Sequence, residues 1–131
     1  YVDAKATDEY GRFVSILGQR GIECDEGWFQ IVWSLSKKIN DLCKAAKIPA
    51  ADYPQVQQIK EKFGGLRFYV SHLPESICER AFNVITTYEK HSYETCEICG
   101  KKGKLREERR WMRTLCDAHA AERAEKSAEK A

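Results

Sequence analysis

Apolar residues recur every three or four positions in three stretches of the chain, and this spacing predicts amphipathic helices. The longest stretch covers residues 25–47, with Asp25 as the expected N-cap. Shorter stretches predict a first helix over residues 6–20 and a third that begins at about Pro74. The inward-facing positions, helix by helix, are Phe13, Ile16 and Leu17; Trp28, Val32, Leu35, Ile39, Leu42, Cys43 and Ala46; and Ile77, Ala81, Val84, Ile85 and Tyr88.

Between Val56 and Val70 the pattern changes to an alternation of apolar and polar residues, which predicts β-strands. Gly64-Gly65 is a turn signal inside this segment, so we predict a β-hairpin. The first strand is polar enough to lie at the edge of a sheet. Phe63 and Phe68 are expected in the core, and the pattern gives the hairpin no functional role.

The two tryptophans of the long helix, Trp28 and Trp33, are five residues apart and cannot share one narrow stripe. One of them is expected in the core. The other is expected to be partly exposed, which makes it a candidate for an interface with another protein. The pattern alone does not say which is which.

Composition narrows the class of protein. The chain has 131 residues, of which 43% are hydrophobic and 32% are charged, as in a folded domain with a real core. No apolar run is long enough to span a bilayer, and no secretory pattern opens the chain. Three cysteines are scattered singly, at Cys24, Cys43 and Cys78, which indicates a reducing, cytoplasmic setting.

The other three cysteines and a histidine follow the pattern C-x2-C-x16-C-x2-H. Thiolate sulfur and imidazole nitrogen are the ligands that zinc prefers, and two such pairs suit a tetrahedral site. Four good ligands indicate a closed, structural site rather than a catalytic one with an open position. We therefore predict one structural Zn²⁺ ion, held by Cys96, Cys99, Cys116 and His119.

The segment between the two ligand pairs is strongly basic. From Lys101 to Arg113 there are seven basic residues and two acidic ones, a local charge of +5, whereas the rest of the chain carries 15 basic and 18 acidic residues. The cations and one tryptophan could contact phosphates and a base, or they could offset the negative charge of the zinc site and face a protein. The candidate binding residues are Lys101, Lys102, Lys104, Arg106, Arg109, Arg110, Trp111 and Arg113.

No catalytic signature accompanies the zinc motif. The chain has no Walker motif, no serine elbow, no H-E-x-x-H, and no deaminase signature. The histidines outside the zinc motif, His72 and His91, are isolated, and a treble-clef nuclease would need a further catalytic histidine. We therefore expect a protein that is not an enzyme.

Four segments together resemble a family of short proteins from bacteriophages, prophages and bacteria: "DEGWF", "QIKEKFGGLRFY", "TCEICG" and "TLCDAHA". The likeness covers roughly residues 27–120 and departs at Met112, where family members tend to carry a second tryptophan. The resemblance implies zinc ligation by the same four residues and a phage or prophage context. It implies no reaction.

We expect an α+β fold, with helices packed on a small β-hairpin or sheet and a C-terminal treble-clef-like zinc module. Residues 1–93 would form the core and residues 94–131 the zinc module, with a basic hairpin and a C-terminal helix, as one compact unit. Small phage proteins often block a host target such as a restriction or CRISPR factor. The expected function is therefore binding to a host or phage protein, with nucleic-acid binding as the alternative and a zinc nuclease as a third.

Overall fold

The computed structural model describes residues 21–107 and 112–129, with side chains up to residue 124. The first predicted helix therefore lies outside the described residues, as do Arg109, Arg110 and Trp111. The described elements are β1 (Ile22–Glu23), α2 (Phe29–Ala45), β2 (Gln55–Lys62), β3 (Gly65–Ser71), α3 (Cys78–Ser92), β4 (Lys104–Arg106), β5 (Arg113–Leu115) and α4 (Asp117–Glu129). Short 3-10 turns precede α2, β2 and α3. The predicted α+β class is confirmed.

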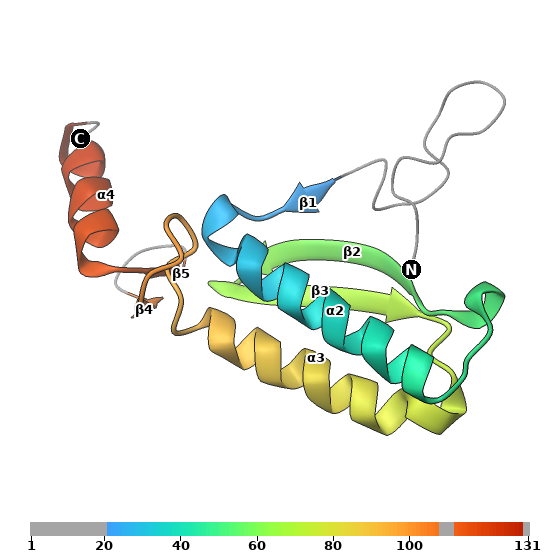
Figure 1. Ribbon diagram of the computed structural model, residues 1–131. Helices are drawn as coiled ribbons and strands as arrows, with labels where there is room; N and C mark the ends of the chain where they lie inside the picture. Colours follow the sequence, from blue (N-terminus) through green and yellow to red (C-terminus); the bar gives the residue numbers. More distant parts are fainter. Residues whose placement is uncertain (1–20, 108–111, 130–131) are drawn as a thin grey trace, which may run out of the picture.

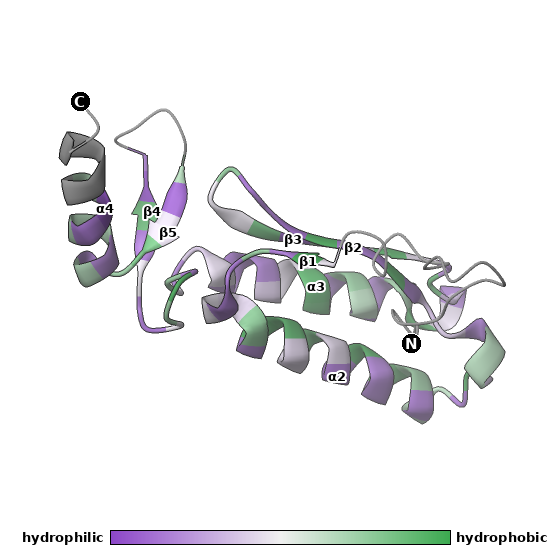
Figure 2. Cartoon of the chain, turned by 90° about the horizontal axis from the view of Figure 1, so that it is seen from above, coloured by the Kyte–Doolittle hydropathy of each residue, from purple (hydrophilic) through white to green (hydrophobic). Residues whose placement is uncertain are grey.

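Two layers make up the larger part of the molecule (Figure 1). One layer is a three-stranded sheet in the order β1-β2-β3, in which β1 runs parallel to β2 and β3 runs antiparallel to it. The other layer is the pair α2 and α3, which covers one face of the sheet (Figures 1 and 2). The β4–β5 hairpin and α4 lie at one end of these layers, beside the β2–β3 turn.

The core lies between the helices and the sheet. Ile59 and Phe68 are in register on β2 and β3 and are both buried, so they mark the covered face. The stripe predicted for α2 is confirmed by the burial of Trp28, Val32, Leu35, Ile39 and Cys43, with Ile31 in addition. Ile77, in the turn before α3, and Ala81 and Ile85 on the helix are buried as predicted, and Val84 and Tyr88 pack against the same cluster.

The predictions that the first hairpin strand lies at an edge and that Asp25 is a side-chain N-cap are both wrong. In each case a contact between distant parts of the chain replaces the local arrangement. β2 is the central strand rather than an edge strand, because the two-residue β1 pairs with it through Ile22 and Glu23. A strand so short leaves no periodic signal in the sequence. Asp25 makes no N-cap hydrogen bond with its side chain, and its carboxylate instead accepts one from Arg113.

The β2–β3 turn places a phenylalanine where glycine or asparagine is favoured. Phe63 and Gly64 have φ angles of 53° and 84°, so both central residues of this two-residue turn are left-handed, as in a type I′ turn. Phe63 is 64% exposed, so its predicted place in the core is wrong, whereas Phe68 is only 3% exposed, as predicted. The turn thus exposes a large ring in a strained backbone conformation.

Helix α3 is tied to β3 by side chains that accept hydrogen bonds from the strand. The Leu66 amide donates to Ser92 Oγ at 2.9 Å, and the Phe68 amide donates to Glu89 Oε2 at 3.0 Å. Gly65 leaves room for the ring of Tyr93, which would lie 2.3 Å from an added Cβ. The close fit of α3 on the hairpin therefore needs both the small residue and the two acceptors.

Replacing Ser92 with Ala should lower the free energy of unfolding by about 1–3 kcal/mol, because the buried Leu66 amide would lose its acceptor. Chemical denaturation of the zinc-loaded protein measures the change. Thr87→Ala is the matched control, since the exposed Thr87 hydroxyl bonds only within α3, and its effect should stay below about 0.5 kcal/mol. Equal effects of the two substitutions would contradict the role assigned to Ser92.

Candidate metal centre

The first ligand pair sits on a tight turn after α3. The Cys96 amide donates to the Lys101 carbonyl at 2.7 Å, and the Gly100 amide donates to the Cys96 carbonyl at 2.9 Å, which closes the turn around Cys96 and Cys99. Gly100 has a φ of +79°, a left-handed conformation in which glycine is not strained. Residues 96–101 thus form a zinc knuckle, and below we use this name for them.

The second ligand pair lies at the start of α4. Cys116 immediately precedes the helix and His119 falls within its first turn, and the Ala120 amide donates to the Cys116 carbonyl at 2.9 Å. Residues three apart on a helix share one face, so both side chains point to the knuckle. Knuckle, hairpin and helix follow in the order of a treble clef. The strands of this hairpin are three residues each, and they pair from Lys104 to Arg106 and from Arg113 to Leu115.

The four side chains converge on a volume the size of one ion. Their ligand atoms all lie within 4.8 Å of one another. Cys99 Sγ is 3.8 Å from Cys116 Sγ, and His119 Nδ1 is 3.5 Å from Cys96 Sγ and 3.2 Å from Cys116 Sγ. A tetrahedral zinc ion with Zn–S near 2.3 Å and Zn–N near 2.0 Å separates its ligands by about 3.5–3.8 Å. The cluster can therefore hold one structural zinc ion.

Backbone amides favour the ligating form of one cysteine. Burial alone would raise the pKa of Cys96, but hydrogen bonds from the amides of Cys116, Cys99 and Ile98 lower it to about 6. The thiolate is the species that binds zinc. The fold therefore presents Cys96 in the form that the metal needs.

The zinc knuckle is docked on the N-terminal end of α2. The Gly27 amide donates to the Glu97 carbonyl at 2.7 Å, and the indole Nε1 of Trp28 donates to the Thr95 carbonyl at 2.9 Å. A Cβ on Gly27 would lie 2.2 Å from the Cys96 carbonyl oxygen. Trp28 is fully buried. Trp28 therefore links the core to the residue that precedes the zinc knuckle.

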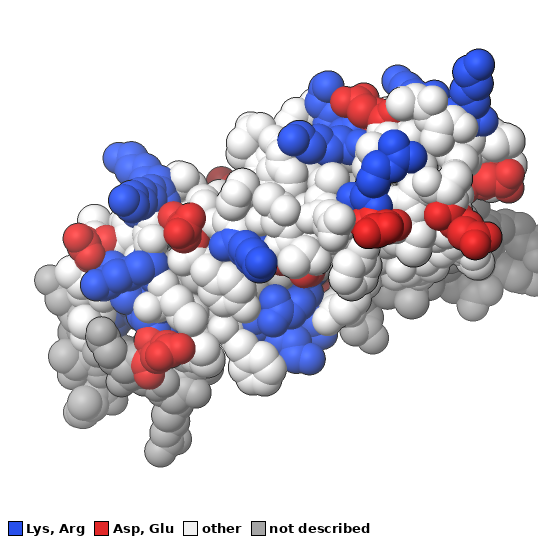
Figure 3. Space-filling view, turned by 90° about the horizontal axis from the view of Figure 1, so that it is seen from below, with Lys and Arg blue, Asp and Glu red and all other residues white. Residues whose placement is uncertain are grey.

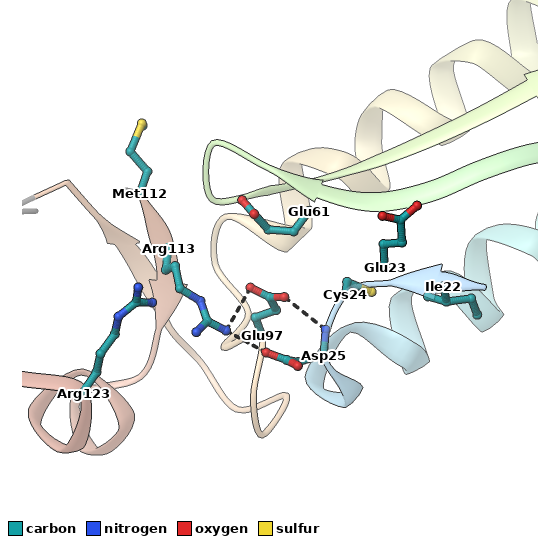
Figure 4. A pocket seen from close by; sticks show the side chains of 9 residues that line it. All are labelled: Ile22, Glu23, Cys24, Asp25, Glu61, Glu97, Met112, Arg113 and Arg123. Carbon is teal, nitrogen blue, oxygen red and sulfur yellow. Dashed lines mark hydrogen bonds and ion pairs between the residues drawn. The ribbon is translucent and has the colours of Figure 1, made fainter. Parts of the chain in front are cut away.

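The buried carboxylate of Glu97 joins the zinc knuckle to the segment before α2 and to strand β5 (Figure 4). Glu97 is 4% exposed. Its carboxylate accepts a hydrogen bond from the Asp25 amide at 3.0 Å and forms an ion pair with Arg113 at 3.3 Å. Burial raises the pKa of Glu97, although the Asp25 amide and the charge of Arg113 oppose that shift. Arg113 also pairs with the Asp25 carboxylate at 2.7 Å. Sequence reasoning missed this network, because Asp25 is 72 residues from Glu97 and 88 residues from Arg113.

The zinc hairpin also contacts the β2–β3 turn. Thr114 Oγ1 donates to the Gly64 carbonyl at 2.7 Å in a buried bond, and a Cβ on Gly64 would lie 2.4 Å from the Leu105 side chain. The turn glycine is therefore needed for close approach as well as for its backbone angles.

The basic residues between the ligand pairs fall into two described groups. Arg106 binds the Leu115 carbonyl and pairs with Asp117 at 2.7 Å, and Arg113 is held in the network around Glu97. The other group, Lys101, Lys102 and Lys104, is exposed. Two of the predicted binding cations therefore hold the fold together, and the described surface of the segment is less basic than its sequence.

None of the protein-family models, curated proteins or solved structures compared with the chain matches it. Among the described residues, no helix is long and apolar enough to cross a membrane.

The purified protein should carry one zinc ion per chain, measured by elemental analysis, and alkylation should count its accessible thiols. With zinc bound, only the exposed Cys78 should react quickly, because Cys43 is buried and the pKa of Cys24 is raised to about 12 by burial and by Glu97 and Asp25. Chelation should add three reactive cysteines, read by mass spectrometry. Cys99→Ala should lose the metal and Cys78→Ala should keep it. Metal-free protein with unchanged thiol reactivity would rule out the site.

Gly27→Ala should loosen the docked zinc knuckle while the four ligands stay intact, because the added methyl group meets backbone oxygens that cannot move aside. The melting temperature should fall by several degrees, and amide exchange should speed up at position 27 and at Asp25, whose amides donate to Glu97. Zinc content should stay at one per chain. Unchanged exchange at these two amides would contradict the docking role of Gly27.

Proposed function

We propose that this protein is a non-enzymatic binding protein in which zinc stabilises the fold and a partner protein binds the exposed aromatic face of α2. The observation that carries the proposal is the exposure of Trp33 on α2, which is 65% exposed, while Trp28, just before the helix begins, is fully buried. Of the two tryptophans, Trp33 is therefore the interface candidate.

Trp33 does not stand alone. Phe29 is 44% exposed and lies four residues earlier, so the two rings share one face of α2, on the side away from the sheet. Ile98, on the zinc knuckle that docks at the start of this helix, is 38% exposed. Single exposed apolar residues are ordinary, but adjacent aromatic rings on a rigid helix are typical of residues that anchor a protein interface.

The zinc site supports a scaffold role rather than a catalytic one. Four protein ligands complete a tetrahedron and leave no position for a reacting water. The resemblance to phage and prophage proteins supplies the proposed context, in which the partner is a host or phage protein, such as a restriction or CRISPR factor, in the host cytoplasm.

Nucleic-acid binding by the basic zinc segment is the second candidate, and the charges of the described residues favour it less. Arg106 and Arg113 are paired with carboxylates, which leaves Lys101, Lys102 and Lys104 for phosphates. Figure 3 shows Lys and Arg interspersed with Asp and Glu over the face seen from below, the side on which α3 lies. Such mixed charge suits protein surfaces better than a polyanion.

A pull-down from bacterial lysate with the tagged full chain tests the proposal. The wild-type protein should retain a partner in stoichiometric amount, and Trp33→Ala should weaken retention by about thirtyfold, as expected for an anchoring tryptophan worth about 2 kcal/mol. Phe82→Ala is the matched control, because Phe82 is 63% exposed on α3, outside this face. Recovery of no stoichiometric partner, or equal loss with both substitutions, would contradict the proposal.

A further inference from the structure

We infer that the open face of the sheet, together with the Phe63 turn, binds single-stranded nucleic acid. This inference goes beyond the proposed function, since it concerns the opposite side of the two layers from α2. The described residues place no element on this face of the sheet (Figures 1 and 2). We call it the open face, and its residues are Gln58, Lys60, Lys62, Arg67 and Tyr69, with Phe63 at the turn and Glu23 on β1.

The strand register determines which side chains share this face. Ile59 and Phe68 are paired and point into the core, so their neighbours along the strands point the other way. Gln58 is paired with Tyr69, and Lys60 is paired with Arg67. The open face is therefore built on two long, rigid strands.

The charge on the open face is positive and is only partly offset by acidic residues. Lys60 lies directly opposite Arg67, a pairing of like charges that destabilises a sheet. Glu23 is in register with Lys60 on the other side and offsets one charge, but neither Lys60 nor Lys62 forms an ion pair within the described chain. Arg67 is held in place by bonds to the Leu66 carbonyl and the Tyr93 hydroxyl.

Two exposed rings alternate with these cations. Tyr69 is 41% exposed and Phe63 is 64% exposed. Lys60 Nζ lies 6.0 Å from the centre of the Tyr69 ring, and Lys62 Nζ lies 5.7 Å from that of Phe63. Each ring thus has an ammonium group over one of its faces, close enough to reach the phosphate of a base stacked on the ring.

Phe63 is the residue that a purely structural account does not explain. Its left-handed φ of 53° and its exposed ring both cost stability, and asparagine would fit this turn better. Local rules that are broken without a gain in packing mark functional sites. Here two are broken on one surface: the phenylalanine in the turn and the paired cations.

The spacing suits an extended single strand. At about 3.3 Å per residue, Phe63 and Tyr69 are separated by roughly 15 Å along the hairpin, too far to sandwich one base. They can stack two separated bases of one strand, while Lys60 and Lys62 bind the phosphates between. A duplex hides its base faces and offers only phosphates.

Fluorescence anisotropy with short oligothymidine, oligouridine and a duplex of equal length tests the inference on the zinc-loaded full chain. We expect both single strands to bind and the duplex to bind more weakly. Affinity should fall with salt, and Lys60→Gln/Lys62→Gln should lower the slope of log K against log salt by about 1.4, at roughly 0.7 per phosphate contact. Lys44→Gln/Lys90→Gln, a pair of exposed lysines on the helices, should leave the slope unchanged.

Phe63→Asn separates binding from folding. Because Asn-Gly is favoured in a type I′ turn, the variant should melt at the same or a higher temperature than the wild type. Its affinity for single strands should nevertheless fall roughly tenfold through the loss of stacking. Tyr69→Thr, which keeps a residue that favours strands, should act in the same direction.

Three outcomes would overturn the inference. The first is no binding of either oligonucleotide at low salt. The second is binding that survives Phe63→Asn and Lys60→Gln/Lys62→Gln but is lost in Lys101→Gln/Lys102→Gln/Lys104→Gln, which would assign it to the zinc segment. The third is a protein partner, captured as above, that is released by substitutions on the open face but not by Trp33→Ala. The first two leave the test of α2 untouched, so the two proposals can fail separately, whereas the third would count against both.

Discussion

The contact between Gly27 and the zinc knuckle is the constraint on which the rest of the structure depends. The Gly27 amide reaches the Glu97 carbonyl at 2.7 Å, and no side chain fits between them. This approach brings Trp28 into the core with its indole N–H on Thr95. Because the metal ligands fix the same turn, metal binding contributes to the folding of the layers as well as to the C-terminal module.

The charged network around Arg113 adds specificity to this contact. A buried ion pair gives little net stability, since desolvation offsets the attraction, but a misplaced partner would leave Glu97 buried and unpaired. Asp25, Glu97 and Arg113 come from three separate parts of the chain, so the pairing is satisfied only in the native arrangement. The zinc module is thus held by hydrogen bonds from Gly27 and Trp28 and oriented by charge.

This arrangement brings together segments that are far apart in the sequence. "DEGWF" supplies Asp25, Gly27 and Trp28; "KFGG" supplies the Gly64 carbonyl; and "TCE" and "RTL" supply the atoms that meet them. These segments therefore meet at the joint between the layers and the zinc module. The two surfaces proposed for binding lie on the outer side of α2 and on the open face of the sheet, and the open face is built from the same "QIKEKFGGLRFY" segment that supplies the Gly64 carbonyl.

Much of the fold could be predicted from the sequence, because the spacing of apolar and polar residues within a segment indicates a helix or a strand. The stripes of α2 and α3, the β2–β3 hairpin and the four converging ligands all follow from spacing between near neighbours. Two long-range features could not be predicted from the sequence. One is the parallel pairing of β1 with β2. The other is the ion pair between Asp25 and Arg113, which were expected to be an N-cap and a binding cation. Phe63 was misplaced because its hydrophobicity argued for burial, while the turn forced it outward.

The acceptors that α3 offers to β3 have a consequence for association between copies of the chain. An outer strand with free N–H groups is a template on which another chain can add a strand, the first step toward domain swapping and fibrils. Ser92 and Glu89 already occupy the outward N–H groups of Leu66 and Phe68. At the other edge, the described strand β1 is only two residues long. Strand addition would have to displace two native bonds at one edge and would find almost no template at the other.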